Sequence, residues 1–207
     1  MLTNGGLETA AGPIVRVPTR WTWRDHLGAM AMRWGIGRDR YVVQPGLYAV
    51  GNPGKTSPLV ATANYKLSFN HARRAFAGLD AWVMVLDTKG INVWCAAGKG
   101  TFGTEEVVNR LAAVGAAQVV DHSTVILPQL AGPGVSAHEV RKRSGFKVVY
   151  GPVRAADLPA FLRSGMRATF CGSFCLSVPP VALRGFMKGA SSLRLASRRA
   201  SLRSMAV

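Results

Sequence analysis

The apolar run that ends at Asp87, Ala81-Trp82-Val83-Met84-Val85-Leu86, constrains the fold of this chain more than any other segment. An unbroken apolar run of this length predicts a strand that is buried on both faces of a sheet. The chain then passes through a ten-residue segment, Ile91–Gly100, which contains the only cysteine in the first 170 residues. A helix is predicted to follow, over Thr104–Val114. This order of strand, cysteine turn and helix favours an α/β architecture.

The rest of the chain also alternates between strand and helix patterns. Strands are predicted at Tyr41–Val43, Leu47–Val50, Leu59–Ala63, Gln118–Val120, Thr124–Leu127 and Phe146–Tyr150, and helices at Trp21–Trp34, Asn70–Gly78 and Ser136–Ser144. The alternation predicts a three-layer, Rossmann-like α/β domain with a mostly parallel sheet and ligand loops at the carboxyl ends of its strands. We assign residues 21–168 to this domain and residues 1–20 to a loose lead-in. Residues 169–207 form a basic, Ser/Arg-rich tail that we expect to be disordered.

Cys95 lies at a position where chemistry is expected. A thiol just past the end of a strand, at the start of a helical turn, is close to backbone N–H groups that favour its thiolate form. The alternative is that Cys95 is a small buried apolar residue, as most free cysteines are. The asparagine, tryptophan, glycine and lysine residues around it favour a functional turn.

The segment Asn92–Lys99, Asn-Val-Trp-Cys-Ala-Ala-Gly-Lys, closely resembles the cap-helix signature of the mercury-methylating corrinoid proteins, the HgcA family. The resemblance covers about Trp21 to Ala168 and includes Val60–Lys66, Leu127–Leu130 and Val149–Val153. This family is related to the corrinoid-binding domain of the corrinoid iron–sulfur protein of acetyl-CoA synthesis. Its members carry a C-terminal membrane domain, and we expect the tail of residues 169–207 to replace that domain here.

The resemblance implies a corrinoid-dependent methyltransferase that passes a methyl group to Hg(II). It implies a cobalamin-type corrinoid, base-off and methylated in its working state, with the Cys95 thiolate as lower axial cobalt ligand. A thiolate donates more electron density than a histidine, which suits transfer of methyl as a carbanion equivalent. The familiar histidine motif Asp-x-His-x-x-Gly is absent. The implied partners are a small ferredoxin with two iron–sulfur clusters as reductant and a methyltetrahydrofolate-dependent methyl donor.

The predicted site combines the cysteine turn with the ends of neighbouring strands. Small residues of the turn are expected to let the backbone approach the macrocycle, and Trp94 is expected to pack and fix the turn. Thr62 and Asn64 are expected to hydrogen-bond corrin amides, although ordinary turn chemistry explains the outer positions equally well. The predicted cofactor contacts are Thr62, Asn64, Asn92, Val93, Trp94, Cys95, Ala96, Ala97, Gly98, Lys99, Pro128, Gln129 and Gly151.

Two nucleotide-binding patterns compete with this interpretation. Ala49–Thr56 fits a relaxed P-loop, but Pro58 follows closely and disfavours the helix that a P-loop needs. Gly98–Gly103 is a literal G-x-G-x-x-G, but eleven positions separate Asp87 from Gly98. A dinucleotide fold places the first glycine directly after the strand. A nucleotide-binding α/β protein and a general methyl-carrier corrinoid protein therefore stay as alternatives.

Composition limits the remaining classes of protein. Three cysteines in no paired framework fit a reducing compartment. No apolar stretch reaches the roughly 18 residues of a spanning helix, so we expect a cytoplasmic protein or one peripheral to the cytoplasmic face of the inner membrane. The net charge of +16 is spread over helix faces and the tail, without an aromatic-interleaved platform, so no specific nucleic-acid partner is predicted. Cys171 and Cys175 have no nearby histidine or further cysteine and are not predicted to bind a metal.

Overall fold

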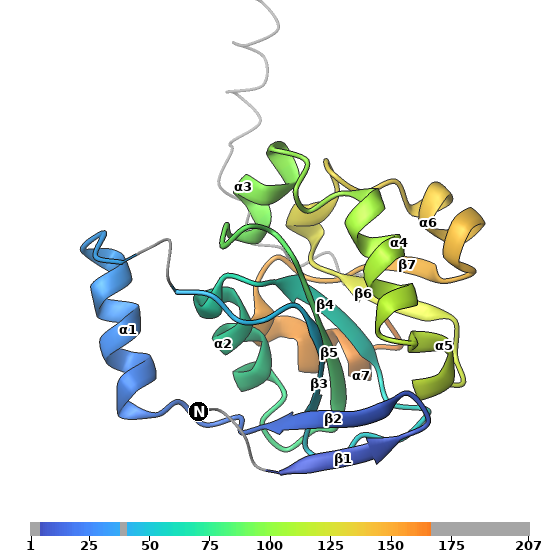
Figure 1. Cartoon of the computed structure of the whole chain (residues 1–207), viewed down its shortest axis with the longest axis horizontal. Helices are drawn as coiled ribbons and strands as arrows, with labels where there is room; N and C mark the ends of the chain where they lie inside the picture. The colour runs from blue at the N-terminus through green and yellow to red at the C-terminus, as the bar shows by residue number, and fades with distance from the viewer. Residues whose placement is uncertain (1–4, 38–40, 167–207) are drawn as a thin grey trace, which may run out of the picture. The chain divides into compact units, whose positions relative to one another are not determined.

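A seven-stranded mixed sheet organises the chain, in the strand order β1-β2-β3-β5-β4-β6-β7 (Figure 1). The structure is a computed structural model and describes residues 5–37 and 41–166. Strands β4, β5, β6 and β7 pair in parallel, as do β2 and β3, whereas the pairs β1·β2 and β3·β5 are antiparallel. The strands are β1 (Gly6–Thr9), β2 (Gly12–Val17), β3 (Gly46–Val50), β4 (Leu59–Ala63), β5 (Ala81–Leu86), β6 (Thr124–Leu127) and β7 (Lys147–Tyr150).

Helices cover both faces of this sheet. The α-helices are α1 (Trp23–Arg33), α2 (Lys66–Ala75), α3 (Val93–Gly98), α4 (Thr104–Ala113), α5 (Ala116–Val119), α6 (Ala137–Ser144) and α7 (Leu158–Arg163), and short 3-10 turns lie at Gln129–Ala131 and Ala155–Asp157. Every residue of β5 is buried, and its side chains alternate between two apolar clusters. Trp82 and Met84 pack with α4 and α6, whereas Val83 and Val85 pack with α2 and α7. The predicted three-layer α/β fold is confirmed.

The parallel core agrees closely with the sequence analysis. The strands at Leu59–Ala63 and Thr124–Leu127 have the predicted bounds. Strand β5 and helix α4 end within one residue of their predicted ends. Helix α2 begins at Lys66, four residues before its predicted start. The predicted strand at Tyr41–Val43 is reduced to an isolated bridge between Val42 and Tyr65.

Two further predictions about local structure are wrong. The loose lead-in over residues 1–20 instead contains the β1–β2 hairpin, because Ile14 and Val17 are buried against the body and β2 pairs with β3. The predicted strand Gln118–Val120 is largely helical, in α5. Gly115, with a φ of 59°, turns the chain sharply after α4, and Ala116 and Val119 then face the core one helical turn apart. The tail of residues 169–207, with Cys171 and Cys175, lies outside the described residues.

Candidate functional site

A cavity of about 590 Å³ opens at the carboxyl ends of the parallel strands, between α2 and α3. Thr62 comes from β4, Pro128 follows β6, and Gly151 follows β7. The carboxyl ends of parallel strands meet at one edge of a sheet, so segments far apart in the sequence converge there. The first turn of α3 closes the remaining side. Six predicted contact residues line this cavity: Thr62, Asn92, Val93, Trp94, Pro128 and Gly151.

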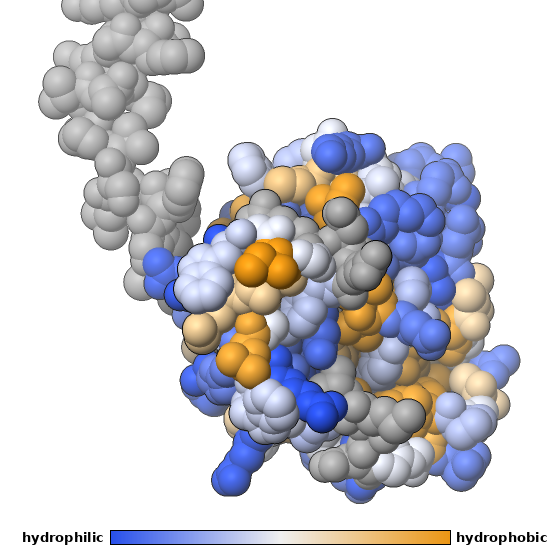
Figure 2. Space-filling view, turned by 60° about the vertical axis from the view of Figure 1, so that its left-hand side comes forward, coloured by the Kyte–Doolittle hydropathy of each residue, from blue (hydrophilic) through white to orange (hydrophobic). Residues whose placement is uncertain are grey.

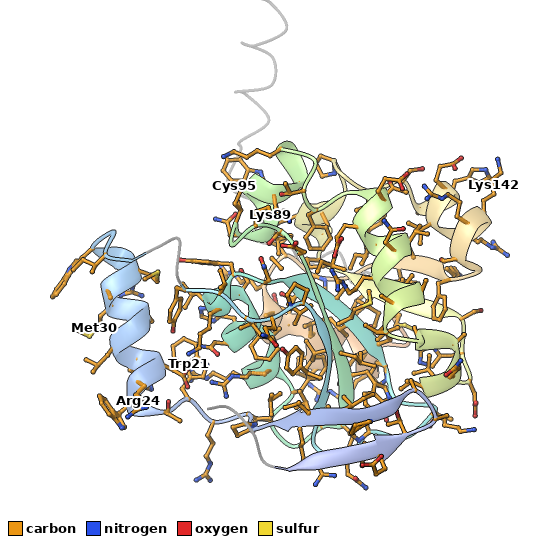
Figure 3. The ribbon with its side chains drawn as sticks, viewed as in Figure 1. Trp21, Arg24, Met30, Lys89, Cys95 and Lys142 are labelled. Carbon is orange, nitrogen blue, oxygen red and sulfur yellow. The ribbon has the colours of Figure 1, made fainter. Side chains whose placement is uncertain are left out.

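The helix α3 carries Cys95 directly after three of these lining residues. Asn92 caps the helix, since its Oδ1 accepts a hydrogen bond from the backbone N–H of Cys95 at 3.0 Å. Cys95 is a free, partly exposed cysteine that follows these residues and does not itself line the cavity. Figure 3 shows Cys95 and Lys89 at the same end of the molecule, beyond the carboxyl edge of β5. Trp94 is 67% exposed and borders the cavity, so it does not pack to fix the turn as predicted.

The small residues of α3 face the protein interior. Ala96 and Ala97 are buried in the core rather than in the cavity wall. A Cβ atom added to Gly134 would lie 3.0 Å from the Ala97 Cα and 2.4 Å from the Phe102 carbonyl oxygen. The backbones of Gly134 and Ala97 therefore approach each other closely, and the predicted approach of the turn to a macrocycle stays a prediction. Gly98, Lys99 and Gln129 are exposed and lie outside the cavity lining.

Asn64 holds the loop that leads from β5 into α3. Its Oδ1 accepts hydrogen bonds from the Thr88 N–H at 3.2 Å and the Gly90 N–H at 2.9 Å, and lies 2.8 Å from the Thr88 hydroxyl. Its Nδ2 donates to Asp87 at 3.3 Å. Asn64 and Thr88 are both buried. Both polar atoms of the Asn64 side chain are thus engaged within the protein, and this residue positions the loop before Cys95.

Three polar side chains in the cavity lining were not predicted. Ser68 and His71 come from α2, and Arg154 comes from the loop after β7. Partial burial of the His71 ring, together with the charge of Arg74, lowers the pKa of His71 and favours its neutral form. The Trp21 ring contacts the His71 ring edge-on, with centroids 5.2 Å apart. The helix predicted over Asn70–Gly78 placed His71 on a helix but not at the cavity, and it did not include Ser68 or Arg154.

The two nucleotide-binding alternatives lack their required geometry. The turn at residues 51–58 runs directly into β4, so no helix follows it to bind phosphate. The first glycine of Gly98–Gly103 is the last residue of α3 and does not follow a strand, and Gly103 precedes α4 as its N-cap. Across residues 5–37 and 41–166, no group of three His, Cys, Asp or Glu side chains is placed to hold a metal ion.

Comparison with known proteins identifies relatives of this domain. The chain is 30% identical over 129 residues to the gamma subunit of the acetyl-CoA decarbonylase/synthase complex of Methanocaldococcus jannaschii, covering 61% of this chain and 26% of that protein. The corresponding subunit of Methanopyrus kandleri is 29% identical over 127 residues, covering 60% and 27%. The chain therefore spans about a quarter of the length of these relatives.

The family assignment rests on a match that covers most of the described domain. The profile of the family described as CO dehydrogenase/acetyl-CoA synthase delta subunit matches residues 27–162. These residues include every strand from β3 to β7, the cavity and α3. This chain belongs to the CO dehydrogenase/acetyl-CoA synthase delta subunit family.

Proposed function

We propose that this chain binds a corrinoid at the cavity beside α3 and that the Cys95 thiolate is its lower axial cobalt ligand. The observation that carries this proposal is a partly exposed, free thiol on the helix whose first residues line the cavity. The metal-binding side chain of this proposal, Cys95, fits a corrinoid. One soft sulfur ligand suits a metal that arrives with its other ligands in a macrocycle, and no competing three-ligand cluster exists among the described residues.

The residues around Cys95 hold the thiol in place. Asn92 fixes the first turn of α3, and the buried Ala97 holds the helix against the body. Asn64 fixes the preceding loop, while Trp94 and Thr62 offer an apolar surface and a hydroxyl in the wall. A bound corrinoid supplies a cobalt–carbon bond from which a methyl group can be transferred. The Cys95 thiolate would donate electron density to the cobalt, which would favour transfer of methyl as a carbanion equivalent.

The resemblance of Asn92–Lys99 to the HgcA family supports Hg(II) as the methyl acceptor. It also supports a ferredoxin with two iron–sulfur clusters as reductant, a methyltetrahydrofolate-dependent methyl donor, and a cytoplasmic or membrane-peripheral location. The relatives named above are subunits of the acetyl-CoA decarbonylase/synthase complex, which favours a second candidate function as a general methyl carrier. Both functions require the same corrinoid site.

The test is reconstitution of the full chain with methylcobalamin, followed by visible absorption spectroscopy. We expect a base-off, thiolate-ligated spectrum that disappears in Cys95→Ala. The matched control carries Cys171→Ala and Cys175→Ala, which remove the other two thiols of the chain and should leave the spectrum unchanged. Added Hg(II) should yield methylmercury faster with the reconstituted chain than with free methylcobalamin, and Cys95→Ala should abolish the difference.

Two outcomes would contradict this proposal in different ways. A protein-specific spectrum that survives Cys95→Ala but is lost in His71→Ala would assign the axial bond to the cavity histidine. A thiolate spectrum without acceleration of methylmercury formation would instead refute Hg(II) as acceptor and leave the general methyl carrier.

A further inference from the structure

Helix α1 turns an apolar face toward solvent. Trp23, Leu27, Met30 and Trp34 are 67%, 52%, 48% and 74% exposed. Their spacing of four, three and four residues places them on one face of the helix. Figure 2 turns this side of the molecule forward and shows hydrophobic surface on it, and Met30 points away from the sheet in Figure 3.

The opposite face of α1 is held by polar contacts. The buried Asp25 carboxylate pairs with the buried Arg73 guanidinium at 2.7 Å, and its other oxygen accepts a hydrogen bond from Asn70 at 3.2 Å. Burial alone raises the pKa of Asp25, but hydrogen bonds from Thr22 and the charges of Arg73 and Lys66 outweigh it and hold that pKa below its usual value. The helix cannot rotate its apolar face inward without breaking this ion pair.

Backbone packing fixes the same orientation. Gly28 sits against the Tyr41 ring, and a Cβ atom at this position would lie 2.5 Å from the Tyr41 hydroxyl oxygen. Helix α1 thus buries Asp25 together with a single large apolar side chain, Met32, and leaves an apolar stripe outside, unlike the usual arrangement of a surface helix. A contiguous exposed apolar stripe of this kind marks a binding surface.

The charges beside the stripe identify the kind of partner. Arg24 and Arg33 are exposed on α1, and Asp25, the only acid of the helix, is buried. Every exposed, fully ionised side chain of α1 is therefore cationic. Pairing with a second copy is disfavoured, because an antiparallel match of Trp23 with Trp34 would also bring Arg24 against Arg33.

We propose that α1 docks on an anionic lipid surface, with its axis in the plane of the membrane. Tryptophans at both ends of a short helix suit the boundary between headgroups and acyl chains, and leucine and methionine between them enter the apolar layer. Arg24 and Arg33 pair with lipid phosphates at the same depth. No helix in the described part of the chain is long and apolar enough to cross a membrane. The helix α1 thus binds at the surface.

The test uses the full chain with vesicles of phosphatidylcholine alone or mixed with equal parts of phosphatidylglycerol. We expect salt-sensitive binding to the anionic vesicles, with a blue shift of tryptophan emission and quenching by brominated lipid. The tail of residues 169–207 contains no tryptophan, so its own attraction to lipid does not produce these signals. Leu27→Ser combined with Met30→Ser should remove the quenching while the circular dichroism spectrum is unchanged.

Charge variants distinguish lipid binding by α1 from a general effect of the protein's net charge. Arg24→Gln with Arg33→Gln should weaken binding about 30-fold, whereas Arg141→Gln with Lys142→Gln on α6, which removes the same charge, should weaken it far less. Equal effects of the two pairs would overturn the proposal, as would equal binding to neutral vesicles. Self-association of the unmodified chain that Leu27→Ser with Met30→Ser abolishes would overturn it in favour of a second copy.

Discussion

The substitution Asn64→Ala should destabilise the protein by about 2–4 kcal/mol and loosen the loop before Cys95. It removes the Oδ1 acceptor of two backbone donors, the N–H groups of Thr88 and Gly90. A buried donor left without a partner costs about 1–3 kcal/mol. The Thr88 hydroxyl contributes less, because the Ile91 carbonyl lies 2.7 Å away and still accepts its hydrogen bond. Two backbone donors that lose their shared acceptor, one of them at the fully buried Thr88, give the expected range.

Urea denaturation measures the loss of stability, and hydrogen exchange followed by mass spectrometry measures the loop. Exchange should accelerate at Thr88–Asn92, and alkylation of Cys95 should become faster because α3 is no longer held at its start. Asn109→Ala is the matched control, since Asn109 is exposed on α4 and its truncation should cost less than about 0.5 kcal/mol. Equal stabilities of the two variants, with unchanged exchange at Thr88 and Gly90, would refute the role assigned to Asn64.

Three further outcomes follow from buried contacts. Arg73→Met leaves the Asp25 carboxylate buried without its main partner and should cost about 3–5 kcal/mol in urea denaturation, whereas the exposed Arg74→Met should cost far less. The pKa of Asp25 is lower in the folded protein than in the unfolded chain, where it is about 3.9. The ionised carboxylate therefore stabilises the protein above the unfolded pKa, and this stabilisation is lost as the pH falls through the folded pKa. Asp25→Asn should accordingly weaken the dependence of the free energy of unfolding on pH in this acidic range. Gly134→Ala forces a Cβ atom to within 2.4 Å of the Phe102 carbonyl oxygen and should lower the free energy of unfolding by about 1–3 kcal/mol, which a normal urea midpoint would disprove.

Much of the fold was predictable because its signals are local. The apolar run of β5 needs burial on both faces, and only a sheet covered by helices supplies it. The β1–β2 hairpin was missed because β2 is stabilised by pairing with β3, about thirty residues away, and not by a long apolar run of its own. The segment Ala116–Val119 was assigned to a strand because four residues carry too little periodicity to distinguish a helical turn from an extended segment.

The sequence by itself determined the α/β class, the strand that precedes Cys95 and the helix that follows its turn, since each of these elements has a pattern within its own short segment. Only the tertiary structure decided which side chains meet. His71 reaches the cavity because α2 packs beside β4, and residue 134 must lack a side chain because the backbone of Ala97 approaches it from α3. The spacing of the apolar residues in the sequence shows that they share one face of α1. The ion pair between Asp25 and Arg73, which are 48 positions apart, turns that face outward. Periodicity defines which residues share a face of a helix, whereas contacts between distant segments decide where that face points.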